Sequence, residues 1–205
     1  MKIQKGEHVF VAGRTGSGKT FLVKRYLQET KPVYVLDLKK TLDWQNVEEA
    51  VYLDKLDKVV KSRSKKVVYQ PDWKEMTAEY YNEFFRFIYH KENVHVWIDE
   101  TMGIGTALKF PEYYKALLTR GRELGISVWS CTQRPATIPM IAMSEATHFF
   151  IFDLNMRKDR FRIAEIAGEE NFMTLPGKYA FWYYNMVESD KPILAKLVER
   201  RSENG

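Results

Sequence analysis

One eight-residue stretch decides the fold: Gly13-Arg14-Thr15-Gly16-Ser17-Gly18-Lys19-Thr20. It has the pattern G-x-x-x-x-G-K-T of a phosphate-binding loop. Its glycines can adopt left-handed backbone conformations, so that backbone N–H groups turn inward around a phosphate. The lysine can reach the β- and γ-phosphates of a nucleotide, and the hydroxyl of the threonine can hold Mg²⁺. We therefore expect all eight residues to bind ATP, and Lys19 to take part in catalysis as well.

The flanking sequence supplies the context that such a loop needs. Residues 8–12 form a short, mostly apolar run that favours a buried strand. Residues 20–27 favour a helix whose N-terminal dipole would face the bound anion. A glycine-rich turn without a ligand is the alternative interpretation, and the strand–loop–helix context argues against it.

Composition limits the class of protein. The 205 residues are 45% hydrophobic and 29% charged, which suits one α/β domain over residues 1–205. The net charge of +5 is compatible with a polyanionic partner. Cys131 is the only cysteine, so a reducing compartment is expected. Because no apolar run approaches the roughly 18 residues of a spanning helix, we expect a cytoplasmic protein without stable membrane insertion.

A second strand ends in two acids. Residues 94–98 are rich in β-branched and aromatic side chains, and Asp99 and Glu100 follow them directly. Downstream of a phosphate-binding loop, this pattern predicts that Asp99 holds Mg²⁺ together with Thr20, and that Glu100 is the general base that polarises the attacking water. An acid pair that only begins a turn is the weaker interpretation.

The rest of the chain alternates between strands and helices, which predicts a mostly parallel central sheet flanked by helices. Further strands are predicted at 33–37, 66–70, 126–132, 147–154, 179–184 and 193–197, the last two extending the sheet. Helices are predicted at 76–88, 111–124, 138–145 and 157–167. The aromatic stripe of 76–88 is assigned to the core, and 101–110 to a mobile loop. His95, His148 and Cys131 lie in strands and are expected to be structural.

Two groups of basic residues each have two interpretations. Lys39 and Lys40 follow a strand end that also carries Asp37, at the edge where open α/β sheets bind ligands, or they are solvated surface lysines. Five basic side chains between residues 58 and 66 have no acid among them. They either contact nucleic-acid phosphates or form a solvated face, and the second interpretation is favoured.

Residues 121–135 resemble a sequence block of the FtsK–HerA ATPases. Gly121-Arg122 with Gly125-Ile126, and the later Thr132-Gln133-Arg134-Pro135, are similar to the GR-x-x-GI and TQRP segments of that family. Asp37-Leu38-Lys39 is similar to its D-P-K, with leucine in place of proline. Together with the two nucleotide motifs, four ordered blocks between residues 8 and 154 match.

The resemblance implies a RecA-like (ASCE) P-loop NTPase core in which the fourth core strand lies between the first and the third. It implies that Gln133 is a polar sensor near the γ-phosphate. Arg122 becomes a candidate arginine finger that reaches a neighbouring subunit's ATP, and Arg120 is a second candidate. For either arginine the alternative is a salt-bridged helix surface.

The resemblance also implies hexameric or pentameric rings that move double-stranded DNA. A bare core of this size resembles the genome-packaging ATPases of viruses with double jelly-roll capsids. It predicts action in the host cytoplasm, docked at a virion vertex through a capsid or portal protein. Candidate DNA contacts, chosen by position, are Lys109, Arg134, Arg157, Lys158 and Arg160. A plasmid or cellular HerA-like translocase or helicase subunit and a low-turnover ATP-gated assembly switch remain as alternatives.

Overall fold

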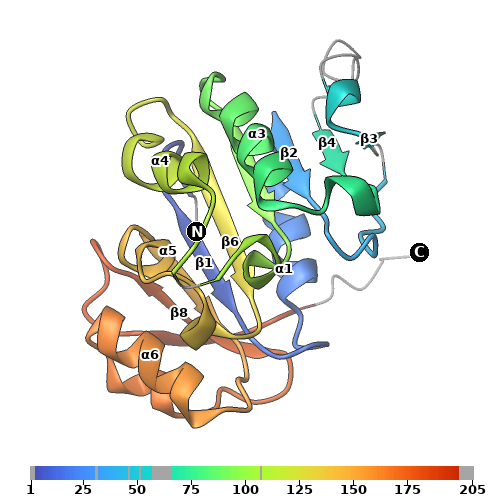
Figure 1. Ribbon diagram of the computed structural model, residues 1–205. Helices are drawn as coiled ribbons and strands as arrows, with labels where there is room; N and C mark the ends of the chain where they lie inside the picture. Colours follow the sequence, from blue (N-terminus) through green and yellow to red (C-terminus); the bar gives the residue numbers. More distant parts are fainter. Residues whose placement is uncertain are drawn as a thin grey trace.

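The computed structural model of the protein describes residues 3–30, 32–45, 47–50, 52–56, 66–106 and 108–198. Within them the strands are β1 (Val9–Ala12), β2 (Val33–Leu36), β3 (Glu48–Ala50), β4 (Lys66–Tyr69), β5 (His95–Ile98), β6 (Ser127–Thr132), β7 (His148–Ile151), β8 (Ala180–Asn185) and β9 (Ile193–Lys196). They form one sheet in the order β3-β4-β2-β5-β6-β1-β7-β8-β9 (Figure 1).

The sheet confirms the predicted α/β class. All pairs from β3 across to β7 are parallel, whereas β8 and β9 are antiparallel and extend the sheet at one side. β6 lies between β1 and β5, which is the inserted strand that the family resemblance implied. β3 is an edge strand that the sequence did not reveal.

The described α-helices are α1 (Lys19–Leu27), α3 (Ala78–Tyr89), α4 (Glu112–Arg120), α5 (Ile141–Ser144) and α6 (Arg157–Ala167). Short 3-10 turns occur at η1 (Leu53–Lys55), η2 (Trp73–Glu75), η3 (Thr101–Ile104), η4 (Pro135–Thr137) and η5 (Glu170–Met173). None of the helices in the described ranges is both long and apolar enough to cross a membrane.

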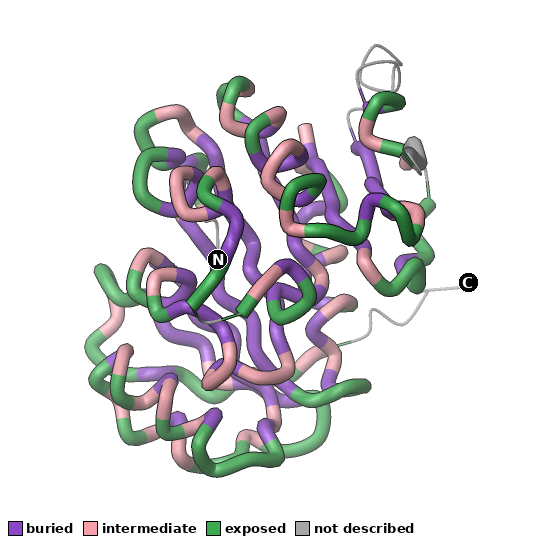
Figure 2. Tube along the Cα trace, viewed as in Figure 1, coloured by how far each residue is buried: buried purple, intermediate pink, exposed green. Residues whose placement is uncertain are grey.

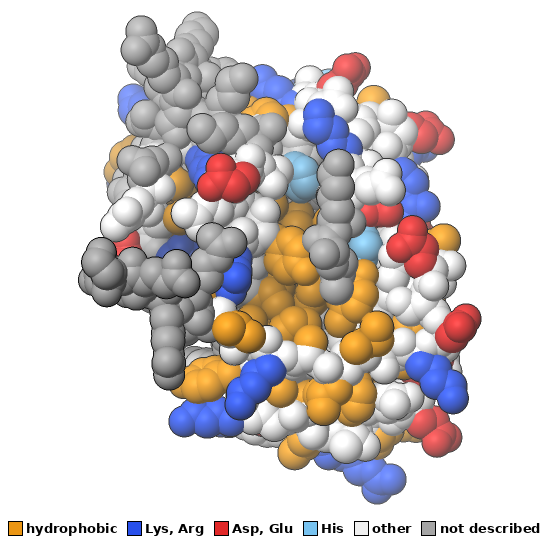
Figure 3. Space-filling view, turned by 180° about the vertical axis from the view of Figure 1, so that it is seen from behind, with side chains coloured by type: hydrophobic (Ala, Val, Ile, Leu, Met, Phe, Trp, Pro, Cys, Tyr) orange, Lys and Arg blue, Asp and Glu red, His pale blue; other side chains and the backbone are white. Residues whose placement is uncertain are grey.

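The helices cover the two faces of the sheet unequally. Side chains alternate along a strand, so Phe10 and Ala12 of β1 pack with α3, α4, α5 and α6, whereas Val9 and Val11 pack with α1. Figure 2 shows the central strands buried throughout, with exposed segments on the outer turns of the helices. Figure 3 looks onto the opposite face, where hydrophobic side chains gather along the middle.

Helix α3 confirms the predicted aromatic core stripe. Tyr81, Phe84 and Phe85 are buried, and the ring of Phe84 stacks on Tyr69 of β4 with centroids 5.4 Å apart. The helix begins after Thr77, whose hydroxyl accepts a hydrogen bond from the backbone N–H of residue 80. Met76, which precedes the helix, and Tyr80, in its first turn, are exposed, so the prediction was wrong in assigning these two residues to the core.

Helix α4 ends earlier than predicted. The sequence indicated a helix running to Leu124, but the helix stops at Arg120 and a series of turns follows. The Gly121 N–H donates to the Leu117 carbonyl at 2.9 Å, and the Gly121 carbonyl then accepts from the Ile126 N–H at 2.8 Å, which leads the chain into β6. A Cβ on residue 121 would lie 2.2 Å from the Leu117 oxygen, so glycine is needed at this turn.

The basic stretch between residues 58 and 66 lies almost wholly outside the described residues. Its one described member, Lys66, begins β4 and is buried. Its ammonium donates to the Gln28 carbonyl and lies 4.5 Å from the centroid of the Trp44 ring. For Lys66 both a nucleic-acid contact and a solvated face are therefore wrong, because the side chain is used for packing.

Candidate nucleotide-binding and hydrolysis site

The phosphate-binding loop joins β1 to α1 at the carboxyl edge of the sheet, as predicted. The Gly13 N–H donates to the Thr132 carbonyl at 3.1 Å and the Arg14 N–H to the Asp153 carbonyl at 2.7 Å. These bonds fix the loop between the ends of β6 and β7. A Cβ on Gly13 would lie 2.6 Å from the Phe152 Cβ, so only glycine allows the loop to lie this close to its neighbour.

The interior of the loop fits a phosphate group. The Ser17 Oγ atom is buried and has no hydrogen-bond partner among the described residues. Gly16 has φ 72°, and a Cβ atom added to it would meet no other atom within 4 Å. The middle of the loop therefore borders open space. The Ser17 hydroxyl and the inward-turned backbone N–H groups could all donate hydrogen bonds to an anion in the loop, which would satisfy them.

Lys19 holds its ammonium group across the loop. The Nζ atom donates to the carbonyls of Gly13 at 2.7 Å and Arg14 at 3.1 Å. Burial lowers the pKa of Lys19, and the negative charges of Glu100 and Asp99 act in the opposite direction. This cation therefore lies between the loop and the two acids that follow β5.

Thr20 and Asp99 converge, although they lie far apart in sequence. The Thr20 hydroxyl donates to Asp99 Oδ1 at 3.3 Å. Burial raises the pKa of Asp99, and the nearby charge of Asp37 raises it further. A hydroxyl and a carboxylate are the oxygen ligands that Mg²⁺ takes from proteins, usually one or two with water and phosphate completing its shell. The pair fits the predicted metal site, and a bound cation would offset the burial of Asp99.

Glu100 is buried, with 4% of its surface exposed, and both of its carboxylate oxygens have partners. Oε1 accepts from the Gln133 backbone N–H at 3.3 Å. Oε2 accepts from Lys39 Nζ at 3.1 Å. Lys39 therefore lies at the carboxyl edge, as predicted, but its side chain is also 43% exposed, and ligand binding by Lys39 stays a prediction.

The turn after β2 places Lys39 against Glu100. The Asp37 carboxylate is fully buried and accepts from the backbone N–H groups of Lys39 at 3.2 Å and Leu42 at 2.9 Å. It also accepts from the Gln70 side chain at 2.9 Å. Three donors on one carboxylate fix this turn, so the lysine is held in place by its own backbone.

Gln133 connects the loop to the acids. Its Oε1 atom accepts from the Thr15 hydroxyl at 2.7 Å, while its backbone N–H donates to Glu100. The structure thus brings together the loop, Thr20, Asp99, Glu100 and Gln133 at one edge of the sheet. That is the arrangement that the resemblance implied for a polar sensor.

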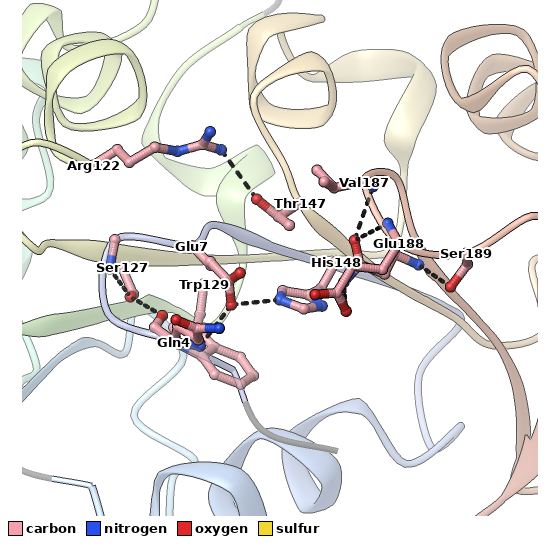
Figure 4. A network of polar contacts seen from close by, with 12 residues as sticks. Gln4, Glu7, Arg122, Ser127, Trp129, Thr147, His148, Val187, Glu188 and Ser189 are labelled. Carbon is pink, nitrogen blue, oxygen red and sulfur yellow. Dashed lines mark hydrogen bonds and ion pairs between the residues drawn. The ribbon is translucent and has the colours of Figure 1, made fainter.

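Arg120 and Arg122 lie at the opposite edge of the sheet. Both are exposed, and Arg122 Nη2 donates to the Thr147 hydroxyl at 3.1 Å, just before β7 begins (Figure 4). The backbone of Arg122 also packs against Gly6, which precedes β1. Since the loop follows β1, neither arginine can reach the phosphate site of its own chain.

Two further contacts around the loop and the acids were not predicted. Asp153, after β7, pairs with Arg14 at 3.9 Å and accepts from the Gly177 N–H at 2.9 Å, so it ties the loop to the segment before β8. The contact between Lys39 and Glu100 was also missed, although the Asp37-Leu38-Lys39 motif marked this turn. Asp153 follows an apolar strand as Asp99 does, which indicates the carboxyl edge, but its contact with the loop also requires β7 to lie beside β1.

Some of the candidate DNA-contacting residues are paired within the chain, and others have exposed side chains. Arg134 pairs with the buried Asp159 at 3.0 Å, and Arg160 Nη1 donates to the Leu154 carbonyl at 2.5 Å. These two arginines thus have structural contacts within the chain. The side chains of the other three candidates are exposed: Lys109, Arg157 and Lys158.

Comparison with known proteins finds matches among solved structures. No family model and no curated protein matches the chain. The DNA-packaging ATPase B204 from Sulfolobus Turreted Icosahedral Virus is 20% identical over 96% of this chain and 100% of its own, with a TM-score of 0.76. The genome packaging NTPase B204 from Sulfolobus turreted icosahedral virus 2, in complex with ATP-gammaS, is 21% identical with a TM-score of 0.75, over 96% of this chain and 100% of its own.

A second group of similar structures comes from other proteins. VirB4 of Thermoanaerobacter pseudethanolicus is 9% identical over 94% of this chain and 89% of its own, with a TM-score of 0.64. The pCW3 conjugation coupling protein TcpA is 14% identical over 94% of this chain and 60% of its own, also with a TM-score of 0.64. The chain therefore has the α/β fold of B204, VirB4 and TcpA.

Proposed function

We propose that this chain is an ATP-hydrolysing motor of the FtsK–HerA type that translocates double-stranded DNA and packages a viral genome into a preformed capsid. The observation that carries the proposal is the convergence of the phosphate loop, the Thr20–Asp99 pair and the linked Glu100 and Gln133 at one sheet edge. The likeness in fold to B204, a packaging ATPase that matches over its whole length, supports packaging as the task.

In this proposal each site residue has a separate role in ATP hydrolysis. Loop N–H groups and Lys19 bind the β- and γ-phosphates and stabilise the negative charge that moves onto them. Thr20 and Asp99 would hold Mg²⁺, which would supply positive charge against the phosphate groups. Glu100 accepts the proton of the attacking water, and the Gln133 side chain beside the loop orients that water. Lys39 positions the Glu100 carboxylate.

The arginines are assigned to a neighbouring subunit. Arg122 and Arg120 are exposed at the edge of the sheet away from the loop, so they can serve only a nucleotide bound by another copy. We propose a ring of five or six chains in which Arg122 supplies the finger, a contact worth about 10³–10⁵ in rate in other NTPases. The exposed Lys109, Arg157 and Lys158 contact the DNA backbone, and a capsid or portal protein docks the ring at the virion vertex in the host cytoplasm.

The first test is ATP turnover against protein concentration, with and without linear duplex DNA. Activity should rise cooperatively with concentration and be stimulated by DNA. Lys19→Ala and Glu100→Gln should each lower turnover by orders of magnitude, while Lys115→Ala, which removes a half-buried lysine paired with Glu112 on the surface of α4, should leave it unchanged. Normal turnover in both site variants would remove the site assignment, and turnover indifferent to DNA would remove the translocation proposal.

Subunit mixing tests the finger. Arg122→Ala chains keep a complete phosphate site, and Lys19→Ala chains keep the arginine. If the finger acts between subunits, mixing two inactive variants should restore part of the turnover, because some interfaces combine an intact loop with an intact arginine. A mixture as inactive as its components contradicts action in trans.

A plasmid or conjugation translocase is the second candidate. Its support is the fold shared with the conjugation coupling protein TcpA and with VirB4. A double jelly-roll capsid gene beside the coding sequence favours packaging, and transfer genes there favour conjugation.

A further inference from the structure

Arg122 is held by a neutral hydroxyl, and its charge is not paired. Nη2 donates to the Thr147 hydroxyl at 3.1 Å, and none of the ion pairs between described residues includes Arg122. The residue is exposed, and the guanidinium has several further N–H donors for which the described part of the chain offers no partner. The arginine is therefore anchored at one nitrogen and keeps the rest of its donors available.

Thr147 is a fixed acceptor. It immediately precedes β7 and is 5% exposed. Its N–H donates to the His8 carbonyl at 2.9 Å, and its own carbonyl accepts from the Met186 N–H at 2.9 Å. Because His8 precedes β1 and Met186 follows β8, the backbone of Thr147 is tied to both neighbouring strands. The hydroxyl that receives the arginine thus has a set position at the amino edge of the sheet.

The start of the chain fixes the backbone of Arg122. Gly6 has φ 85°, and a Cβ added to it would lie 2.8 Å from the Arg122 carbonyl oxygen, so this close approach needs glycine. The Gly6 N–H donates to the hydroxyl of Ser127, the first residue of β6, at 3.0 Å. The arginine is therefore held twice, at its backbone by Gly6 and at its guanidinium by Thr147.

Glu7 attracts the arginine without pairing with it. Its Oε2 atom lies 2.9 Å from His148 Nε2 and accepts from the Gln4 N–H at 2.6 Å (Figure 4). Burial raises the pKa of Glu7, but the hydrogen bond from His148 and, more weakly, the charge of Arg122 bring it below its ordinary value. The carboxylate is occupied by its own neighbours, so it favours a cation at this edge and leaves the guanidinium free to bind elsewhere.

We propose that Thr147 is a positioning residue for hydrolysis: its hydroxyl orients Arg122 so that the free N–H groups meet the phosphates bound by a neighbouring copy. The inference rests on the proposed function, in which Arg122 acts between subunits. An arginine side chain has many rotamers, and ordering it before assembly leaves less entropy to lose when the contact forms. A hydroxyl suits this task better than a carboxylate, because it takes one N–H and leaves the positive charge for the phosphates.

The same contact distinguishes the two candidate arginines. Arg120 ends α4 and is exposed, and its side chain makes no hydrogen bond or ion pair with the residues that the structure describes. Its guanidinium is not oriented by its own chain. Orientation in advance therefore favours Arg122 over Arg120 as the group that acts on the neighbour.

Thr147→Val tests the role, because it removes the hydroxyl and keeps the shape of the side chain. At protein concentrations that saturate wild-type activity, turnover should fall about fivefold to tenfold, as expected for one hydrogen bond that orients a catalytic group. Affinity for a non-hydrolysable ATP analogue should change less than twofold, since the phosphate loop lies at the other edge of the sheet. Thr147→Ser should restore the rate. The matched control is Thr30→Val, which removes a hydroxyl bonded within its own turn to the Tyr26 carbonyl at 3.2 Å and should change neither quantity.

Subunit mixing separates positioning from a structural role. Lys19→Ala chains keep Thr147 and Arg122 but lack a working loop. Adding them to Thr147→Val chains should raise the turnover per Thr147→Val chain several-fold, because intact arginines then face working loops. Chains that carry both Lys19→Ala and Arg122→Ala should give no rise, which excludes an effect of assembly alone.

The outcomes distinguish this inference from the proposed function. The positioning role is overturned by wild-type turnover in Thr147→Val, by a Thr147→Ser variant that is equally slow, or by no rise on adding Lys19→Ala chains, where Arg122→Ala chains are slow and the same addition restores them. If Arg122→Ala chains turn over normally, or are not restored by Lys19→Ala chains, the arginine does not act between subunits, and the inference falls with that part of the proposed function.

Discussion

Two buried histidines should make the stability of this protein depend on pH. His8 accepts the Val128 N–H at Nδ1, 3.1 Å away, and its Nε2 atom lies 3.0 Å from the Leu118 carbonyl, so the ring is neutral and protonated at Nε2. His95 Nδ1 accepts from Trp129 Nε1 at 3.2 Å. A second proton on either ring would face a donor in a buried site. Burial lowers the pKa of both His8 and His95 to about 4.

The size of the effect follows from proton linkage. In the unfolded chain a histidine has a pKa of about 6.5, so between roughly pH 6.5 and 4 the unfolded state binds protons that the folded state rejects. The folded state therefore has its full stability relative to the unfolded state above about pH 6.5, and it loses stability as the pH falls from there towards about 4. Each histidine should lower the free energy of unfolding by about 2 kcal/mol between pH 7.5 and 5, and by about 3 kcal/mol in all once both states are protonated.

Urea unfolding at pH 7.5, 6 and 5, followed by tryptophan fluorescence, measures this loss. His8→Asn and His95→Gln should be less stable than the wild type at pH 7.5, because each removes a buried contact. Each should also lose about 2 kcal/mol less than the wild type on going to pH 5. His90→Gln changes an exposed histidine and should leave the pH dependence as it is. If the double variant at residues 8 and 95 keeps the slope of the wild type, the reasoning is refuted.

Three other predictions follow from single contacts in the site and the core. Lys39→Met should lower the single-turnover hydrolysis rate at least about tenfold without weakening nucleotide binding, because it removes the 3.1 Å contact that positions Glu100. Thr15→Val should lower the turnover rate up to about tenfold, since the 2.7 Å hydrogen bond to Gln133 is worth about 1 kcal/mol. Phe84→Ala should lower the free energy of unfolding by about 3–5 kcal/mol in a urea titration, because its ring is fully buried.

Each of these has a control close by in the chain. Lys40→Met removes an exposed lysine and should leave hydrolysis unchanged, while Thr15→Ser keeps the hydroxyl and most of the rate. Tyr80→Ala, at a ring 39% exposed on the same helix as Phe84, should cost less than about 1 kcal/mol. Equal effects in a variant and its control would mean that the contact named above is not the cause.

The nucleotide motifs could be predicted from sequence because their geometry is local. Eight consecutive residues specify the loop, and an acid pair directly after an apolar strand reaches the carboxyl edge whatever the order of the strands. The contact between Lys39 and Glu100 could not be predicted in this way. It requires β2 and β5 to be neighbours, and that pairing joins residues about 60 positions apart.

The errors have physical causes of the same kind. The end of α4 was misplaced because the helical pattern continues past Arg120, whereas the backbone N–H groups of residues 124 and 126 bond to the Gly121 carbonyl and turn the chain through Gly125, at φ 68°. Lys66 was grouped with surface charges because charge patterns do not reveal that β4 is buried between β2 and β3.

The position of the arginines follows from the topology of a parallel sheet. A residue that precedes a strand lies at the amino edge, and the phosphate loop, which follows β1, lies at the carboxyl edge. The two edges are separated by the length of a strand, about 13 Å for four residues. Arg122 precedes β6 and is held at Thr147 before β7, so no side-chain rotation brings it to its own loop. An arginine required for hydrolysis at this position must therefore come from another copy, and the rate should depend on assembly as steeply as on ATP.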